Sequence, residues 1–95
     1  MDVAVKSDTG FFVGLAEDVS ERGLFVVTVR SIPVGGEVAL ALALPRGDVL
    51  TRGRVRWARS PEEGQVPGVG IEFDAMPAED KERIEAYCAE RRSTK

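Results

Sequence analysis

The segment EVALALAL, residues Glu37–Leu44, decides the fold. Its large side chains stand at every second position from Val38 to Leu44, and alanines fill the positions between them. Because side chains alternate between the two faces of a strand, this order turns one continuous apolar face toward a core. A helix would spread the same large residues around most of its circumference, although alanine and leucine both favour helix. Since Gly36 and Pro45 bound a segment that is short for a helix, we predict a strand.

The segments before and after it also have strand patterns. Alternating apolar residues on both sides of the turn Ser7–Gly10 predict a hairpin. β-Branched and aromatic residues predict further strands near 24–29 and 66–73. In the last of these, Gly68 and Gly70 share one face, which indicates a bend or a close backbone approach.

The segment 49–59 predicts another strand, with two unlike faces. Its odd positions are mostly apolar and place Trp57 in the core, where an indole contributes a large apolar area. Its even positions carry Arg52, Arg54 and Arg56 on the opposite face. These arginines form either a solvated face that discourages edge pairing or a patch for a phosphate or an anionic partner.

The hydrophobic period changes near the C-terminal end. Pro77 suits the first position of a helix, and acidic residues follow it near the positive end of the helix dipole. Ile84, Tyr87 and Cys88 fall at helical spacing and form one apolar stripe. We therefore predict a helix over about 77–92 that packs on the strands.

Length and composition describe one small globular domain. The chain has 95 residues, of which 43% are hydrophobic and 31% charged, enough apolar surface for one core without a metal or disulfide. We predict a single all-β domain over residues 1–95, with about six antiparallel strands within residues 2–74, closed by one C-terminal helix.

The composition also excludes several functions. The chain contains no histidine, the commonest metal ligand and general base, so we expect no metal site and no catalytic residues, and an enzyme is the class that we expect least. A net charge of −3 and six aromatic residues disfavour DNA or RNA binding. Cys88 is the only cysteine, which fits a reducing compartment. We find neither a signal peptide nor an apolar run long enough for a membrane helix, and we expect a cytoplasmic protein without membrane insertion.

The segment DVSERG, Asp18–Gly23, joins two predicted strands and has the pattern D-x-S-x-x-G. Its simplest interpretation is a tight connection. The side chains of Asp18 and Ser20 would accept backbone N–H bonds, and Gly23 would supply a positive φ.

Downstream, the chain continues with GEVALALALP, then GRVRW, then PGVGIEF, and then the predicted helix. This succession, together with D-x-S-x-x-G, resembles the PilZ domain family over nearly the whole chain. The D-x-S-x-x-G element alone is moderately specific, whereas the ordered set is strongly so. The resemblance implies a six-stranded antiparallel β-barrel with a C-terminal helix. It also implies a role in bacterial signalling by the second messenger cyclic di-GMP.

The resemblance further implies a ligand site with two halves. One half corresponds to Asp18, Ser20 and Gly23, where a carboxylate can accept from the two adjacent donors of a guanine edge and glycine lets the backbone come near. The other half is an R-x-x-x-R element just before the first strand, whose guanidinium groups hold phosphates and stack on guanine. Residues 1–10 contain no arginine, and Lys6 is their only cationic side chain.

A literal R-x-x-x-R does occur at Arg52 and Arg56, but not at the position of the family's element. Arg22, inside the matching segment, is the better candidate for a phosphate contact. The residues that we expect to bind a ligand are Asp18, Ser20, Arg22 and Gly23.

Two functions follow from this half-complete pattern. We favour a regulatory module that binds a bacterial protein, such as a motility, polarity or exopolysaccharide component, and in which cyclic di-GMP binding is weak or lost. The alternative is a cyclic di-GMP receptor that uses the Asp18–Gly23 segment and nearby arginines; an arginine element ahead of residue 1 in a longer protein would favour it. No cofactor is required in either case, and cyclic di-GMP is the candidate ligand.

Overall fold

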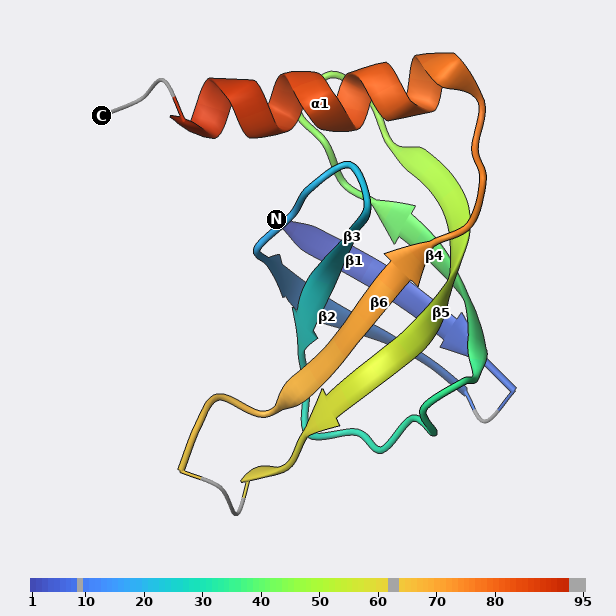
Figure 1. Ribbon diagram of the computed structural model, residues 1–95, viewed down its shortest axis with the longest axis vertical. Helices are drawn as coiled ribbons and strands as arrows, with labels where there is room; N and C mark the ends of the chain where they lie inside the picture. Colours follow the sequence, from blue (N-terminus) through green and yellow to red (C-terminus); the bar gives the residue numbers. More distant parts are fainter. Residues whose placement is uncertain (9, 62–63, 93–95) are drawn as a thin grey trace.

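The computed structural model describes residues 1–8, 10–61 and 64–92, which form six strands followed by one helix (Figure 1). In chain order the elements are β1 (Asp2–Ser7), β2 (Gly10–Glu17), β3 (Gly23–Val27), β4 (Glu37–Leu42), β5 (Val49–Arg59), β6 (Gly68–Phe73) and α1 (Ala78–Arg92). Within the described residues, no helix is long and apolar enough to cross a membrane.

The strands close into an antiparallel barrel in the order β1-β2-β3-β6-β5-β4. Pairing of β1 with β4, which sets Val3 opposite Leu42, closes the barrel. The expected all-β fold, a six-stranded antiparallel barrel with one C-terminal helix, is thus confirmed. The turn expected at Ser7–Gly10 joins β1 to β2, although Thr9 itself lies outside the described residues.

The core fills the barrel and extends to the helix. The alternation that predicted a strand in EVALALAL is confirmed, because Val38, Leu40 and Leu42 are all buried. Full burial of one such aliphatic side chain stabilises the fold by about 1.5–3 kcal/mol. Helix α1 lies across one end of the barrel (Figure 1), and it buries its apolar stripe there: Ile84, Tyr87 and Cys88.

The predicted core position of Trp57 is wrong. Its side chain is 46% exposed, because the β5–β6 register shifts between Val55 and Trp57. Val55 lies opposite Ile71 while Trp57 lies opposite Gly70, so β5 uses two steps where β6 uses one. One extra residue in a strand reverses the alternation of the side chains that follow it, and the indole therefore points outward.

Candidate functional site

The D-x-S-x-x-G segment forms the loop between β2 and β3, and it is held by its own hydrogen bonds. The backbone N–H of Ser20 donates to the carbonyl oxygen of Gly23 at 2.9 Å. The hydroxyl of Ser20 accepts from the backbone N–H of Arg22 at 3.2 Å. The serine thus has the structural role that the simplest interpretation expected.

The positive φ lies at Asp18, with a value of 52°, and not at Gly23 as predicted. Gly23 instead opens β3 and pairs with Glu72 of β6. A Cβ at Gly23 would collide with the carbonyl oxygen of Ile71. The glycine is therefore required by the close approach of two strand backbones and not by a left-handed conformation.

A shallow pocket of about 460 Å³ lies beside this loop. Asp18, Ser20, Arg22 and Gly23 all line it, so the structure brings the four expected ligand-binding residues together. Strands β3, β5 and β6 supply the other walls: Leu24, Phe25, Arg56, Trp57, Gly70, Ile71 and Glu72.

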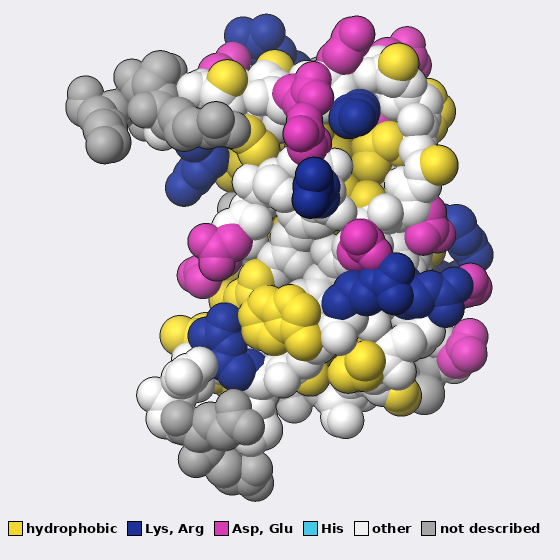
Figure 2. All heavy atoms as spheres, in the orientation of Figure 1, with side chains coloured by type: hydrophobic (Ala, Val, Ile, Leu, Met, Phe, Trp, Pro, Cys, Tyr) yellow, Lys and Arg dark blue, Asp and Glu magenta, His cyan; other side chains and the backbone are white. Residues whose placement is uncertain are grey.

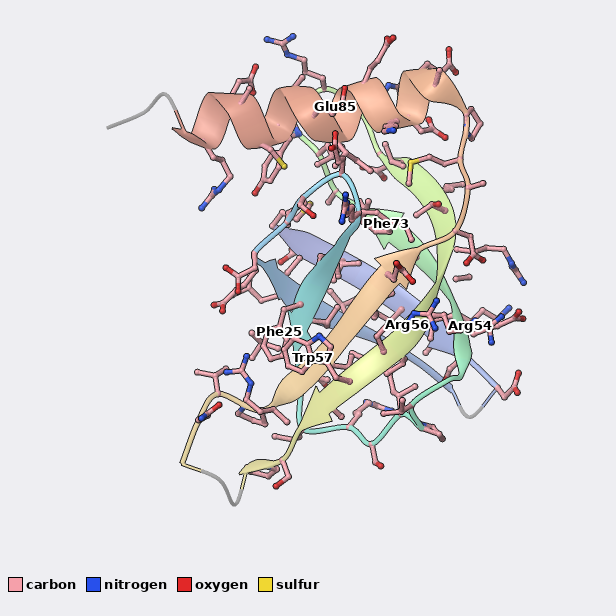
Figure 3. The ribbon with its side chains drawn as sticks, in the orientation of Figure 1. Phe25, Arg54, Arg56, Trp57, Phe73 and Glu85 are labelled. Carbon is pink, nitrogen blue, oxygen red and sulfur yellow. The ribbon has the colours of Figure 1, made fainter. Side chains whose placement is uncertain are left out.

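An aromatic stack borders the pocket, and the sequence analysis did not foresee it. The rings of Phe25 and Trp57 lie 5.2 Å apart at an interplanar angle of 16°. The guanidinium of Arg59 lies over both rings, 4.5 Å from the centroid of Phe25 and 5.2 Å from that of Trp57. Figure 3 shows the two rings side by side, and Figure 2 shows hydrophobic side chains next to basic ones on this face.

Two glycines of β6 make room for this stack. A Cβ at Gly70 would collide with the indole of Trp57, and one at Gly68 would lie 2.5 Å from the ring of Phe25. The close backbone approach expected from the sequence is present at Gly68, where a Cβ would also meet the carbonyl oxygen of Val26, whereas at Gly70 the close group is the indole side chain. The two glycines were visible in the sequence, but the bulge that turns Trp57 outward could not be located from it.

The three arginines expected to share one face have different surroundings. Arg56 lines the pocket and forms an ion pair with Glu72, with an Nη2–Oε1 distance of 2.6 Å. Arg54 pairs with Glu37 at 2.9 Å and donates to the carbonyl oxygen of Gly35. Arg52 lines a separate groove.

These pairs change the charge that the pocket offers a ligand. Exposed ion pairs contribute little stability, about 0–1 kcal/mol, but each neutralises a cation. Within the described residues that line the pocket, Arg22 is the one cation without an ion pair. An anionic ligand would have to compete with Glu72 for Arg56.

The loop is also in contact with α1. The Sγ of Cys88 lies 3.1 Å from the carbonyl oxygen of Val19, close enough for the thiol to donate a hydrogen bond. A hydrogen bond with the Glu21 side chain raises the pKa of Glu85, and slight desolvation and repulsion by Glu21 add to the increase. Figure 3 shows Glu85 on the helix above the loop. The helix therefore restrains the segment that carries the motif.

A closed six-stranded barrel with a D-x-S-x-x-G loop beside a shallow pocket defines a small β-barrel binding domain. The chain belongs to the PilZ domain family, whose model matches residues 1–90. The resemblance found in the sequence is thus confirmed. A comparison with curated proteins gave no match.

Solved structures show the same fold. The Bacillus subtilis inhibitor of motility, MotI/DgrA, superimposes with a TM-score of 0.85 at 22% identity, over 99% of this chain and 47% of that one. The PlzA protein of Borreliella burgdorferi, in complex with c-di-GMP, gives a TM-score of 0.67 at 18% identity, over 90% of this chain and 31% of that one.

The PilZ domain of CeSA from a cellulose-synthesizing bacterium gives a TM-score of 0.62 at 18% identity, over 88% of this chain and 84% of that one. At these identities the likeness shows the fold. The chain spans about half of the Bacillus protein and about a third of the Borreliella protein.

Proposed function

We propose that this chain is a bacterial signalling module that acts in the cytoplasm by binding a protein partner, and that its affinity for cyclic di-GMP is weak or lost. The supply of unpaired cations at the pocket carries the proposal. The chain has only the D-x-S-x-x-G half of the family's ligand motif, and Arg56, the strand arginine at the pocket, already pairs with Glu72.

The physical argument concerns the two phosphates of the dinucleotide. Strong phosphate binding relies on charge-assisted, bidentate bonds from arginine. Residues 1–10 supply no arginine, and Arg22 is the only cation of the described pocket lining that is not in an ion pair. The net charge of −3 also repels a dianion. We therefore expect this chain to bind cyclic di-GMP weakly, because it offers the phosphates too few unpaired arginines.

The relatives support both sides of the question. MotI/DgrA is named an inhibitor of motility, which fits action on a protein partner such as a motility, polarity or exopolysaccharide component. PlzA was solved with c-di-GMP bound, which fits the alternative.

The alternative function, a cyclic di-GMP receptor, has one specific observation in its favour. The pocket combines Asp18, Ser20 and Arg22 with the outward-facing ring of Trp57. A guanine base stacks well on an aromatic face, and such stacking contributes about 1–3 kcal/mol per base.

Trp57 provides the test, because it is the only tryptophan and it lines the pocket. We would titrate cyclic di-GMP and follow Trp57 fluorescence, with free N-acetyltryptophanamide titrated in parallel as the control for absorption by the ligand. We expect no saturable change up to about 1 mM, a concentration that would detect binding as weak as about −4 kcal/mol. A saturable change at micromolar ligand would establish the receptor function instead.

A further inference from the structure

The outer surface of four adjacent strands, β2, β1, β4 and β5, carries a second hollow, distinct from the motif pocket. The register aligns their outward-facing side chains in two rows. One row is Val13, Ala4, Ala41 and Leu50; the next is Phe11, Lys6, Ala39 and Arg52. In Figure 1, β1 and β2 lie behind β3 and β6, so the part of this surface that β1 and β2 form faces away from the viewer.

The distribution of side-chain sizes makes this surface a groove. The two middle strands present three alanines and Lys6, while the flanking strands present three large apolar side chains and Arg52. The resulting groove has a volume of about 420 Å³. Two apolar side chains that line it are strongly exposed, Phe11 at 56% and Leu50 at 74%, and Val13, opposite Ala4 on β2, is 62% exposed. Adjacent exposed apolar side chains of this size mark interaction surfaces in soluble proteins.

The shape of the groove restricts what can bind there. The barrel is closed, so among the described strands no edge is open for strand addition. The partner must therefore bind through side chains. Strands β2 and β5 are three strand spacings apart, at most about 14 Å, and an α-helix with its side chains is about 10–12 Å wide. The groove thus suits a helix that lies along β1 and β4.

The charged side chains at the groove restrict the kind of helix that can bind. Lys6 and Arg52 flank Ala39 on either side, and within the described residues neither forms an ion pair. The described lining of the groove includes no acidic side chain, and Glu37, the next outward-facing residue of β4, is held by Arg54. A bound segment with a carboxylate at this end of the groove would meet two cations.

We propose that this groove docks an amphipathic helix of a partner protein, with aliphatic or aromatic side chains over Ala4 and Ala41 and a carboxylate at Lys6 and Arg52. The proposal rests on the proposed function, because it names the surface through which a module acting by protein contact would bind. A second copy of the chain is a poorer occupant: in a two-fold interface the groove would face itself, and it brings cations and no carboxylate.

Selection from random dodecapeptides displayed on phage tests the proposal without a known partner. We expect the enriched peptides to combine apolar residues at helical spacing with Asp or Glu. Lys6→Glu should weaken the binding of a selected peptide by about tenfold or more, since like charges then face each other. Lys81→Glu, the same charge change on the exposed side of α1, is the matched control and should leave binding unchanged.

A second variant, Ala41→Arg, places a large side chain on the floor of the groove and should also abolish binding while the barrel stays folded by circular dichroism. Enriched peptides that are basic, or that bind Lys6→Glu and Ala41→Arg as well as the parent chain, would overturn the proposal. So would concentration-dependent dimerisation in sedimentation that Ala41→Arg abolishes, because the groove would then bind a second copy. A failure of the proposed function itself would be detected separately, as saturable binding of cyclic di-GMP in the Trp57 fluorescence titration.

Discussion

The motif pocket and the apolar groove occupy different walls of one barrel, and they treat their charged side chains differently. At the pocket, Arg56 is paired with Glu72 and Arg59 lies over the Phe25–Trp57 stack. At the groove, Lys6 and Arg52 form no ion pair with any residue that the structure describes, and they lie beside exposed apolar side chains. Within the described residues, the strand cation of the motif pocket, Arg56, is thus paired and Arg22 of the loop is not, whereas both cations of the groove lie unpaired beside exposed apolar side chains.

The largest loss of stability should come from the substitution Gly23→Ala at the edge of the pocket. A Cβ there meets the backbone of Ile71, which cannot move without opening the β3–β6 pairing. We expect a loss of about 3 kcal/mol or more in the free energy of unfolding, measured with urea. Ala41→Val, on the open floor of the groove, is the control and should change stability by less than about 0.5 kcal/mol. Equal stability of the two variants would contradict the proposed packing constraint.

The second-largest loss of stability should distinguish two exposed apolar side chains, Trp57 and Leu50. Trp57 stacks on Phe25 and lies against Gly70, whereas Leu50, at 74% exposure, flanks the groove. Trp57→Ala should reduce the free energy of unfolding by about 2 kcal/mol, because it removes an aromatic contact and its buried area. Leu50→Ala should reduce it by less than about 0.5 kcal/mol. If both substitutions reduce the free energy of unfolding equally, the stack has no special structural role and the two walls do not differ in packing.

A smaller effect concerns the ion pair of the pocket. A double-mutant cycle with Arg56→Gln and Glu72→Gln should give a coupling energy of about 0.5 kcal/mol that falls as salt is added. Lys6→Gln on the groove wall should leave stability unchanged at either salt concentration, since it breaks no ion pair. A salt-dependent loss at Lys6 instead would show that the groove cations are already satisfied within the chain.

The smallest effect is at the contact between the loop and the helix. The pKa of Glu85 is raised in the folded chain by its hydrogen bond with Glu21, so its ionisation opposes folding near neutral pH. Glu85→Gln should therefore raise the melting temperature slightly at pH 7. The difference should shrink as the pH falls through the raised pKa, where the native Glu85 is itself protonated. A difference that does not depend on pH would exclude this cause.

Much of the fold could be predicted from local pattern. Alternation in Glu37–Leu44 predicted a strand with one buried face, which the structure forms over Glu37–Leu42, and the helical spacing of Ile84, Tyr87 and Cys88 predicted the helix face that covers the barrel. Both follow from periodicity, which depends on neighbouring residues. The reversal of Trp57 could not be predicted, because it depends on how β5 pairs with β6, a strand separated from it by a loop.

The candidate site was predicted only in part, because a sequence pattern depends on neighbouring residues and not on strand pairing. The loop residues Asp18, Ser20 and Arg22 are close in sequence and remain together at the pocket. By contrast, Arg52 and Arg56 have the same parity in one strand, yet they lie at different hollows, since they are four residues apart along β5: Arg52 lies opposite Ala39 of β4, and Arg56 pairs with Glu72 of β6. Of the apolar groove, only Arg52 was anticipated, as part of a possible patch for an anionic partner, because the groove combines positions from four strands that only the barrel topology brings together.

A calorimetric titration of cyclic di-GMP into this 95-residue chain tests the central claim most directly. Our account predicts no binding heat from a folded sample at ligand concentrations up to about 1 mM, because the phosphates find too few unpaired arginines. Binding at micromolar concentration, lost in Arg22→Ala or Asp18→Ala, would contradict it and assign the signalling role to the pocket.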